Sequence, residues 1–115
     1  MPWAVEIENH DGRGLTLVKL AEAHAARGEQ ERALVLIDQS LAARRLAGSR
    51  WGEADGLARR GRILQALGRP GEARESWEAA LELYEEVDDP RATDIRTYLE
   101  GHATDLEVVL SLPGW

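Results

Sequence analysis

The feature that most constrains this chain is an internal repeat with a period of 40 positions in a sequence of 115 residues. Residues 17–41 and 57–81 align without a gap, and five pairs of positions are identical: Leu17 and Leu57, Ala26 and Ala66, Gly28 and Gly68, Ala33 and Ala73, and Leu41 and Leu81. In each copy, apolar residues at helical spacing stand on both sides of a glycine-containing turn. The period therefore predicts a helical hairpin that occurs twice in succession.

Small residues in the second copy predict how its two helices pack. Gly61 in the first helix and Ala73 in the second allow the two backbones to approach closely, and Trp77 is expected to fill the space beside them. Tyr84 continues the apolar series two turns further along the second helix. Trp77 is therefore the expected centre of the core.

Glycine, proline and capping residues divide the chain into five expected helices. The stop and start signals are, in chain order, Gly28, Gly48, Ser49, Gly68, Pro70, Asp89 and Pro90. They place helices at about 15–27, 30–47, 50–67, 70–87 and 90–103. Gly101 stands 40 positions after Gly61, so the fifth helix is expected to begin a third, unfinished repeat.

The first 13 residues allow two interpretations. Trp3, Val5 and Ile7 alternate with less apolar residues, as in a short strand. The repeat instead places residues 1–13 at the end of a preceding helix, or as an N-terminal cap, and we favour this interpretation. Residues 10–14, His-Asp-Gly-Arg-Gly, are then expected to form a loop between helices.

The repeat resembles the tetratricopeptide family, whose pattern is W-x2-L-G-x2-Y followed by A-x3-F. The first copy offers Leu17, Leu20, Ala21, His24, Ala33 and Ile37 at these positions, and the second offers Leu57, Arg60, Gly61, Leu64, Ala73 and Trp77. Leu17, Leu20, Ala21 and His24 form the expected buried stripe of the first helix, and Leu57, Gly61 and Leu64 form that of the corresponding helix in the second copy. Arg60 departs from the pattern, because this position is usually apolar. Because the family period is about 34 residues, the second helix of each pair is expected to be longer here. The stretch from residue 66 to residue 96 also resembles the C-terminal repeats of actinobacterial regulators of the antibiotic regulatory protein class.

The resemblance implies an all-α fold, in which antiparallel helical hairpins stack into a right-handed superhelix of about 2.5 repeats. The single domain then contains a first repeat at 14–47, a second at 52–87 and a half repeat at 90–103. Residues 104–115 are expected to form a capping tail, because Leu106 to Leu112 is too apolar to be left in water. As a helix or as an extended segment, it would cover one end of the stack.

Composition excludes several classes of function. The net charge of −7 argues against nucleic acid as a direct partner, since such binding depends on neutralising phosphates. The chain contains no cysteine, so disulfides, zinc–thiolate sites and cysteine nucleophiles are excluded. No secretory signal is apparent and no stretch approaches the roughly 20 apolar residues that span a membrane, so we expect a cytoplasmic protein without membrane contact. The resemblance to actinobacterial regulators implies that it is bacterial.

The residues give little sign of catalysis. The three histidines form no metal-binding spacing, and His24 occupies the aromatic position of the repeat, where a packed side chain is expected. The glutamates between residues 72 and 86 follow the expected solvent face of one helix. We therefore expect no enzyme activity, no cofactor and no metal.

The tetratricopeptide resemblance implies that the first helix of each hairpin lines a concave, partner-binding groove. Carried over by repeat position, this groove includes Val18, Lys19, Glu22, Arg59, Arg62, Gln65, Tyr98 and His102. Lys19, Arg59 and Arg62 would form a basic patch that captures an acidic group of a peptide. The alternative is that these arginines pair with neighbouring glutamates. Family members that clamp a peptide carboxylate use asparagines, whereas the single asparagine of this chain is Asn9.

Two functions follow from this pattern. The first is a non-enzymatic scaffold that binds a protein or peptide partner, and the second is a sensory or regulatory domain of a bacterial transcriptional regulator. A homodimer is also expected, because Leu34 to Leu36 have no preceding repeat to cover them and because a stack of this kind usually needs at least about three repeats.

Overall fold

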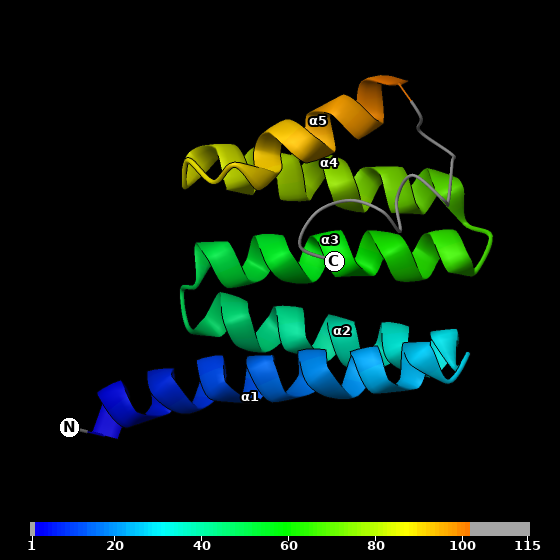
Figure 1. Cartoon of the computed structure of the whole chain (residues 1–115). Coiled ribbons are helices and arrows are strands. Elements are labelled where there is room, and N and C mark those ends of the chain that lie inside the picture. The colour runs from blue at the N-terminus through cyan, green and yellow to red at the C-terminus, as the bar shows by residue number, and fades with distance from the viewer. Residues whose placement is uncertain (1, 102–115) are drawn as a thin grey trace.

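The computed structural model describes residues 2–101, and the side chains of residues 12–100. Within that range the chain forms five α-helices and no strand: α1 (Pro2–Ala26), α2 (Gln30–Leu46), α3 (Arg50–Ala66), α4 (Pro70–Glu86) and α5 (Arg91–Gly101). Successive helices run antiparallel, and each packs on the next in chain order (Figure 1). The prediction of an all-α stack of helical hairpins is confirmed, whereas the predicted capping tail at 104–115 lies outside the described residues.

Turns that recur every 20 residues account for the 40-residue period. Gly28, Gly48, Gly68 and Asp88 occupy equivalent places after α1, α2, α3 and α4, with φ of 80°, 71°, 75° and 56°. Glycine adopts this left-handed conformation without steric cost, and aspartate is one of the few other residues that tolerate it. Because α3 and α4 contain 17 residues each, the longer period lengthens both helices of the pair. The prediction that the second helix would be the longer one is wrong for this hairpin.

Side chains and backbone groups cap the helices where the sequence placed them. The hydroxyl of Ser49 accepts a hydrogen bond from the backbone N–H of Gly52 at 3.1 Å, which satisfies one free donor at the start of α3. Pro70 opens α4, where its missing N–H costs nothing. The carboxylate of Asp89 accepts from the N–H of Arg91 at 2.9 Å, so α5 begins at Arg91, one residue later than predicted.

The first helix differs most from its prediction. Residues 10–14 lie inside α1, which runs without interruption through 25 residues, so the predicted interhelix loop is wrong. The glycines that suggested a loop have another role at Gly14: a Cβ built there would lie 2.6 Å from Cγ of Arg44. The hydroxyl of Ser40 also donates to the backbone carbonyl of Gly14 at 2.7 Å. Gly14 therefore allows α2 to pack closely against α1.

Trp77 forms the centre of the larger core cluster, as predicted. Its side chain is 1% exposed, and a Cβ at Gly61 would lie between 2.2 and 2.6 Å from three atoms of its indole ring. The indole N–H donates to the backbone carbonyl of Ala58 at 3.0 Å. The ring of Tyr98 meets the indole edge to face, with centroids 4.9 Å apart. One side chain thus joins α3, α4 and α5.

Two members of the predicted stripe on the first helix are not buried as expected. Leu20 is 46% exposed, because the buried side of α1 follows Leu17, Val18 and Ala21. His24 lies near the end of α1, where Nδ1 is 3.2 Å from a carboxylate oxygen of Glu29. His24, which occupies the aromatic position of the first repeat, is therefore partly exposed and makes a polar contact at the α1–α2 turn.

Candidate partner-binding groove

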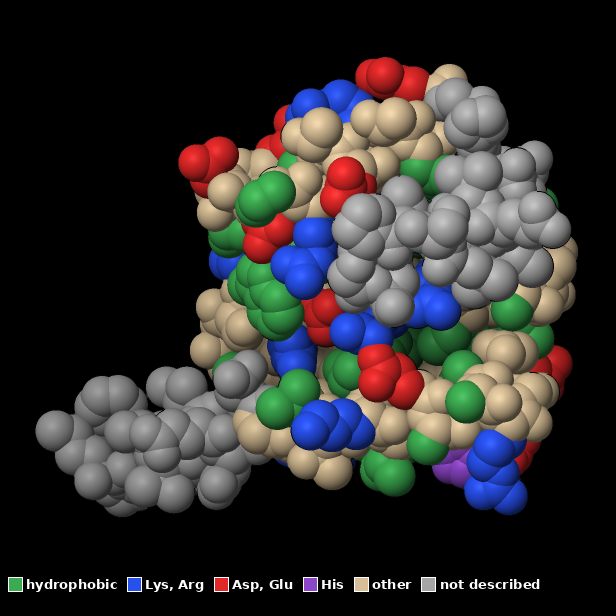
Figure 2. Space-filling model, in the orientation of Figure 1, with side chains coloured by type: hydrophobic (Ala, Val, Ile, Leu, Met, Phe, Trp, Pro, Cys, Tyr) green, Lys and Arg blue, Asp and Glu red, His purple; other side chains and the backbone are tan. Residues whose placement is uncertain are grey.

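A hollow of the described structure lies where α1 and α3 both pack on α2. It encloses about 540 Å³, within the range of small-ligand and peptide pockets. Its lining residues are mostly apolar and small: Ala21, Glu22, Ala25, Ala26, Gln30, Ile37, Arg59, Arg62, Ile63 and Ala66. The short side chains of the alanines leave this space unfilled. On this face of the molecule, positively and negatively charged side chains surround apolar ones (Figure 2). We refer to this hollow as the α1–α3 groove.

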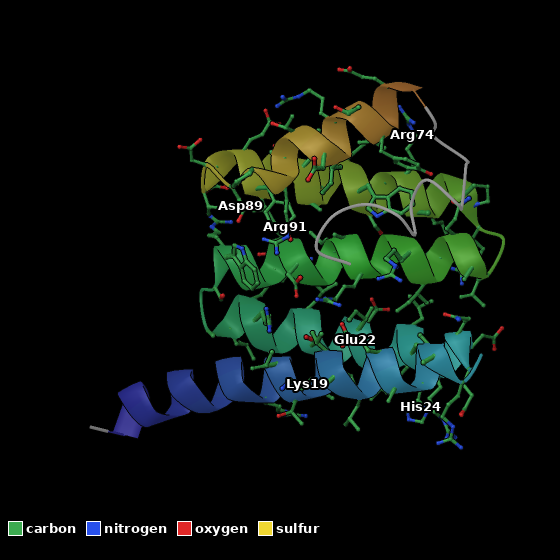
Figure 3. All side chains as sticks on the ribbon, in the orientation of Figure 1. Lys19, Glu22, His24, Arg74, Asp89 and Arg91 are labelled. Atoms are coloured by element: carbon green, nitrogen blue, oxygen red, sulfur yellow. The ribbon has the colours of Figure 1, made fainter. Side chains whose placement is uncertain are left out.

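An arginine crosses the groove from one wall to the other. Nε of Arg59 lies 3.2 and 3.1 Å from the two carboxylate oxygens of Asp55, one turn earlier on α3. Its terminal nitrogen pairs with the carboxylate of Glu22 on α1. Figure 3 shows Glu22 on the side of α1 that faces α3, and His24 on the side turned away. This ion pair therefore bridges the two first helices of the hairpins.

The carboxylate that anchors Arg59 belongs to a buried polar cluster. Asp55 is 6% exposed, and burial raises its pKa above the ordinary value, against the lowering effect of Arg44 and then of Arg91. Arg44 is 4% exposed, and one of its nitrogens lies 4.0 Å from Asp55. Burial, reinforced by the charge of Asp55, raises the pKa of the neighbouring Tyr84 hydroxyl. The ion pair between Arg59 and Asp55 is thus fixed by a carboxylate that lies in the core, unlike an exposed ion pair on the surface.

Arg62 lies on the same wall one turn further along α3, but unlike Arg59 it is not held by an ion pair to a described residue. It is partly buried, and this burial lowers its pKa from the ordinary value. Over the side chains of residues 12–100, Arg62 makes no hydrogen bond and no ion pair. Its charge also lowers the pKa of Arg59, after the larger effect of burial. The groove therefore carries one partly buried positive charge that no described residue neutralises.

Comparison with known proteins identifies the repeat. The family model described as tetratricopeptide repeat matches residues 54–87, which cover most of α3 and all of α4. The chain contains a tetratricopeptide repeat, and the match places it at residues 54–87. Regulatory protein AfsR of Streptomyces griseus is 34% identical over 87 residues, which represent 76% of this chain and 9% of that relative. The predicted resemblance to such regulators is confirmed, and the chain spans less than a tenth of the relative. No solved structure matches the chain.

The structure brings together part of the groove predicted for a tetratricopeptide repeat protein. Glu22, Arg59 and Arg62 line the α1–α3 groove. Lys19 is exposed on α1, three residues before Glu22, and Gln65 is partly buried one turn beyond Arg62; neither is among the residues that line the groove. The binding role of these five residues remains a prediction.

Two other predicted groove residues do not lie in it. Val18 and Tyr98 are 3% and 2% exposed, so they pack in the core and do not present a surface to a partner. Both were placed by repeat position alone, which cannot distinguish a groove residue from a neighbour turned inward. His102 lies outside the described residues.

Sequence reasoning missed the apolar lining of the groove. Ala25, Ile37 and Ile63 were read as packing residues or passed over, although each lines the hollow. A signal existed at Ile63: it is apolar, yet it stands outside the buried positions of the tetratricopeptide pattern. Over the described residues, no cluster of three or more histidines or acidic side chains could hold a metal ion, and none of the helices is long and apolar enough to cross a membrane.

Proposed function

We propose that this chain is a non-enzymatic interaction module whose α1–α3 groove binds a protein segment carrying apolar side chains and an acidic group. The observation that carries the proposal is the combination of an apolar floor with the charge of Arg62 at the wall, which no described residue neutralises. An apolar side chain of a partner gains free energy by leaving water for the groove. A carboxylate beside Arg62 gains a charge-assisted hydrogen bond in a partly desolvated place.

The tetratricopeptide match supports this class of function, since the family consists of interaction scaffolds. The partner is a protein and not a nucleic acid, because the chain carries a net charge of −7. We place the module in the cytoplasm of a bacterium and expect it to be a homodimer. Val35 on α2 is 57% exposed and is the part of the predicted flank that a second copy would cover. Leu34 and Leu36, which were predicted to be uncovered, are partly buried against the core.

Selection from a random peptide library displayed on phage tests the proposal. The full chain should enrich peptides that combine aliphatic residues with aspartate or glutamate. Arg62→Glu should weaken these peptides at least about tenfold, because it replaces attraction with repulsion at a partly buried site. The matched control is Arg32→Glu, which makes the same charge change on an exposed part of α2. Failure to enrich such peptides, or peptides that bind both variants equally, would refute the groove as the binding site.

A second function is favoured by the relative named Regulatory protein AfsR. We propose as an alternative that the module serves a bacterial transcriptional regulator, as its sensory or regulatory part. Immunoprecipitation of the tagged full chain from its host tests this alternative. A DNA-binding regulator that is recovered with the chain, and is lost with Arg62→Glu, supports it. Partners that include no such regulator contradict it.

A further inference from the structure

The α1–α3 groove sets two requirements for an occupant. Its floor, which includes Ile37 and Ile63, accepts small and branched aliphatic side chains. Its wall presents Arg62, whereas Arg59 is already engaged by Asp55 and Glu22. An occupant therefore needs aliphatic residues with a carboxylate next to them.

One segment of this chain meets both requirements. Residues 105–112 read Asp-Leu-Glu-Val-Val-Leu-Ser-Leu, with five aliphatic residues and two carboxylates in eight positions. No lysine or arginine follows Arg96 anywhere in the sequence, so this segment brings no positive charge to oppose Arg62. Its charge and its apolar character are thus complementary to the groove.

The place where α5 ends puts this segment within reach. Tyr98, in the last turn of α5, contacts the indole of Trp77, and that indole contacts Gly61, the neighbour of Arg62. Arg74 of α4 donates to the backbone carbonyl of Leu99 at 3.3 Å, which fixes the end of α5 on the stack. In Figure 1, α5 ends at the same end of the stack as α1 and α3. Six extended residues span roughly 20 Å, which is about two interhelical distances, so a stretch of the length of residues 102–107 is long enough to reach from the end of α5 past α4 to α3.

We propose that residues 105–112 dock in the α1–α3 groove of the same molecule, with their aliphatic side chains on its floor and Asp105 or Glu107 beside Arg62. The segment then acts as an internal competitor, which a partner must displace before it binds. This inference rests on the proposed function for its regulatory meaning, but the docking itself requires no partner. A test of docking therefore fails or succeeds independently of any test of partner binding.

Disulfide trapping in the full chain tests the docking, because the chain contains no cysteine of its own. The test pair is Ala66→Cys with Val108→Cys, since Ala66 lines the groove and is exposed. The matched control is Thr97→Cys with Val108→Cys. Thr97 is exposed on α5, closer to the tether, so an undocked segment would meet it at least as often as it meets Ala66. Circular dichroism checks that both variants retain the same helical content.

Docking predicts that the Ala66–Val108 pair closes within one molecule at least about tenfold faster than the Thr97–Val108 pair at low micromolar concentration. Adding Arg62→Glu to the test pair should bring its rate down to the control rate, and Arg62→Lys should leave it high. Equal rates for the two pairs would overturn the proposal. A disulfide that joins two chains on a non-reducing gel would also overturn it, since the occupant would then come from a second copy.

Discussion

Gly61→Ala is the substitution that probes the packing of this repeat most directly. A Cβ at this position would lie 2.2 Å from Nε1 of Trp77 and within 2.6 Å of two further atoms of the indole. The ring cannot swing aside freely, because its N–H is bonded to the carbonyl of Ala58 and the ring is packed against that of Tyr98. The new methyl group must therefore displace the ring or separate α3 from α4.

The magnitude follows from three contributions. Overpacking a close-packed core costs about 1–3 kcal/mol. Loss of the hydrogen bond from Trp77 to Ala58 adds about 1 kcal/mol, and the better helix propensity of alanine returns about 1 kcal/mol. We expect a net loss of about 1–3 kcal/mol in the free energy of unfolding, of which each kcal/mol lowers Tm by roughly 4–8 °C.

Urea and thermal unfolding, followed by circular dichroism, measure this loss. The matched control is Gly71→Ala, because a Cβ at Gly71 in the first turn of α4 meets nothing within 4 Å. In a double-mutant cycle, Trp77→Ala alone should cost about 3–5 kcal/mol. Gly61→Ala should then be neutral or stabilising in the Trp77→Ala background, since the clash has been removed. An equal cost of Gly61→Ala in both backgrounds, or no cost in the parent chain, would refute the reasoning.

Three further predictions concern other parts of the molecule. Gly12→Ala should raise the free energy of unfolding by up to about 1 kcal/mol, because Gly12 lies inside α1 with open space around it; a lower Tm would argue for a loop there. Burial raises the pKa of Asp55 above its ordinary 3.8, so the folded chain binds the carboxyl proton of Asp55 more tightly than the unfolded chain does. The contribution of Asp55 to stability therefore falls as the pH rises from the unfolded pKa of 3.8 through the higher folded pKa. Asp55→Asn should remove this fall from urea midpoints measured between about pH 3 and pH 7, and unchanged pH dependence would contradict the assignment. Light scattering over a concentration series should show the mass of a homodimer, and a monomer at every concentration would disprove that expectation.

The repeat made the core predictable from sequence, because its buried positions are defined by their spacing. Gly61 and Trp77 were recognised as a packing pair because a small residue and a large one stood at positions that face each other in a hairpin. Ser49 and Pro70 were equally readable, since capping depends on local chemistry alone. These residues act through neighbours that are close in sequence or related by the period.

The loop at residues 10–14 was mispredicted because glycine can either end a helix or allow two helices to pack closely. Gly28 ends α1 with a positive φ, whereas Gly14 is helical and makes room for Arg44. A single sequence cannot separate these uses, since both remove a Cβ. The distinction needs the position of Arg44, which lies 30 residues further along the chain and makes its contact only after α2 has folded onto α1.

The groove was only partly predictable, because its character depends on which charges are already paired. Sequence analysis treated Arg59 and Arg62 as equivalent members of a basic patch. The structure separates them: Arg59 is held by Asp55 and Glu22, while no described residue pairs with Arg62. A partner that competed for Arg59 would have to break two ion pairs, one of them to a buried carboxylate, and would leave that carboxylate without its nearest cation. A partner carboxylate at Arg62 breaks no ion pair among the described residues. The difference supports our proposal that Arg62 serves recognition, whereas Arg59 holds α1 and α3 at their spacing. We therefore expect Arg62→Glu to change partner affinity with little effect on folding, and Arg59→Glu to lower stability as well.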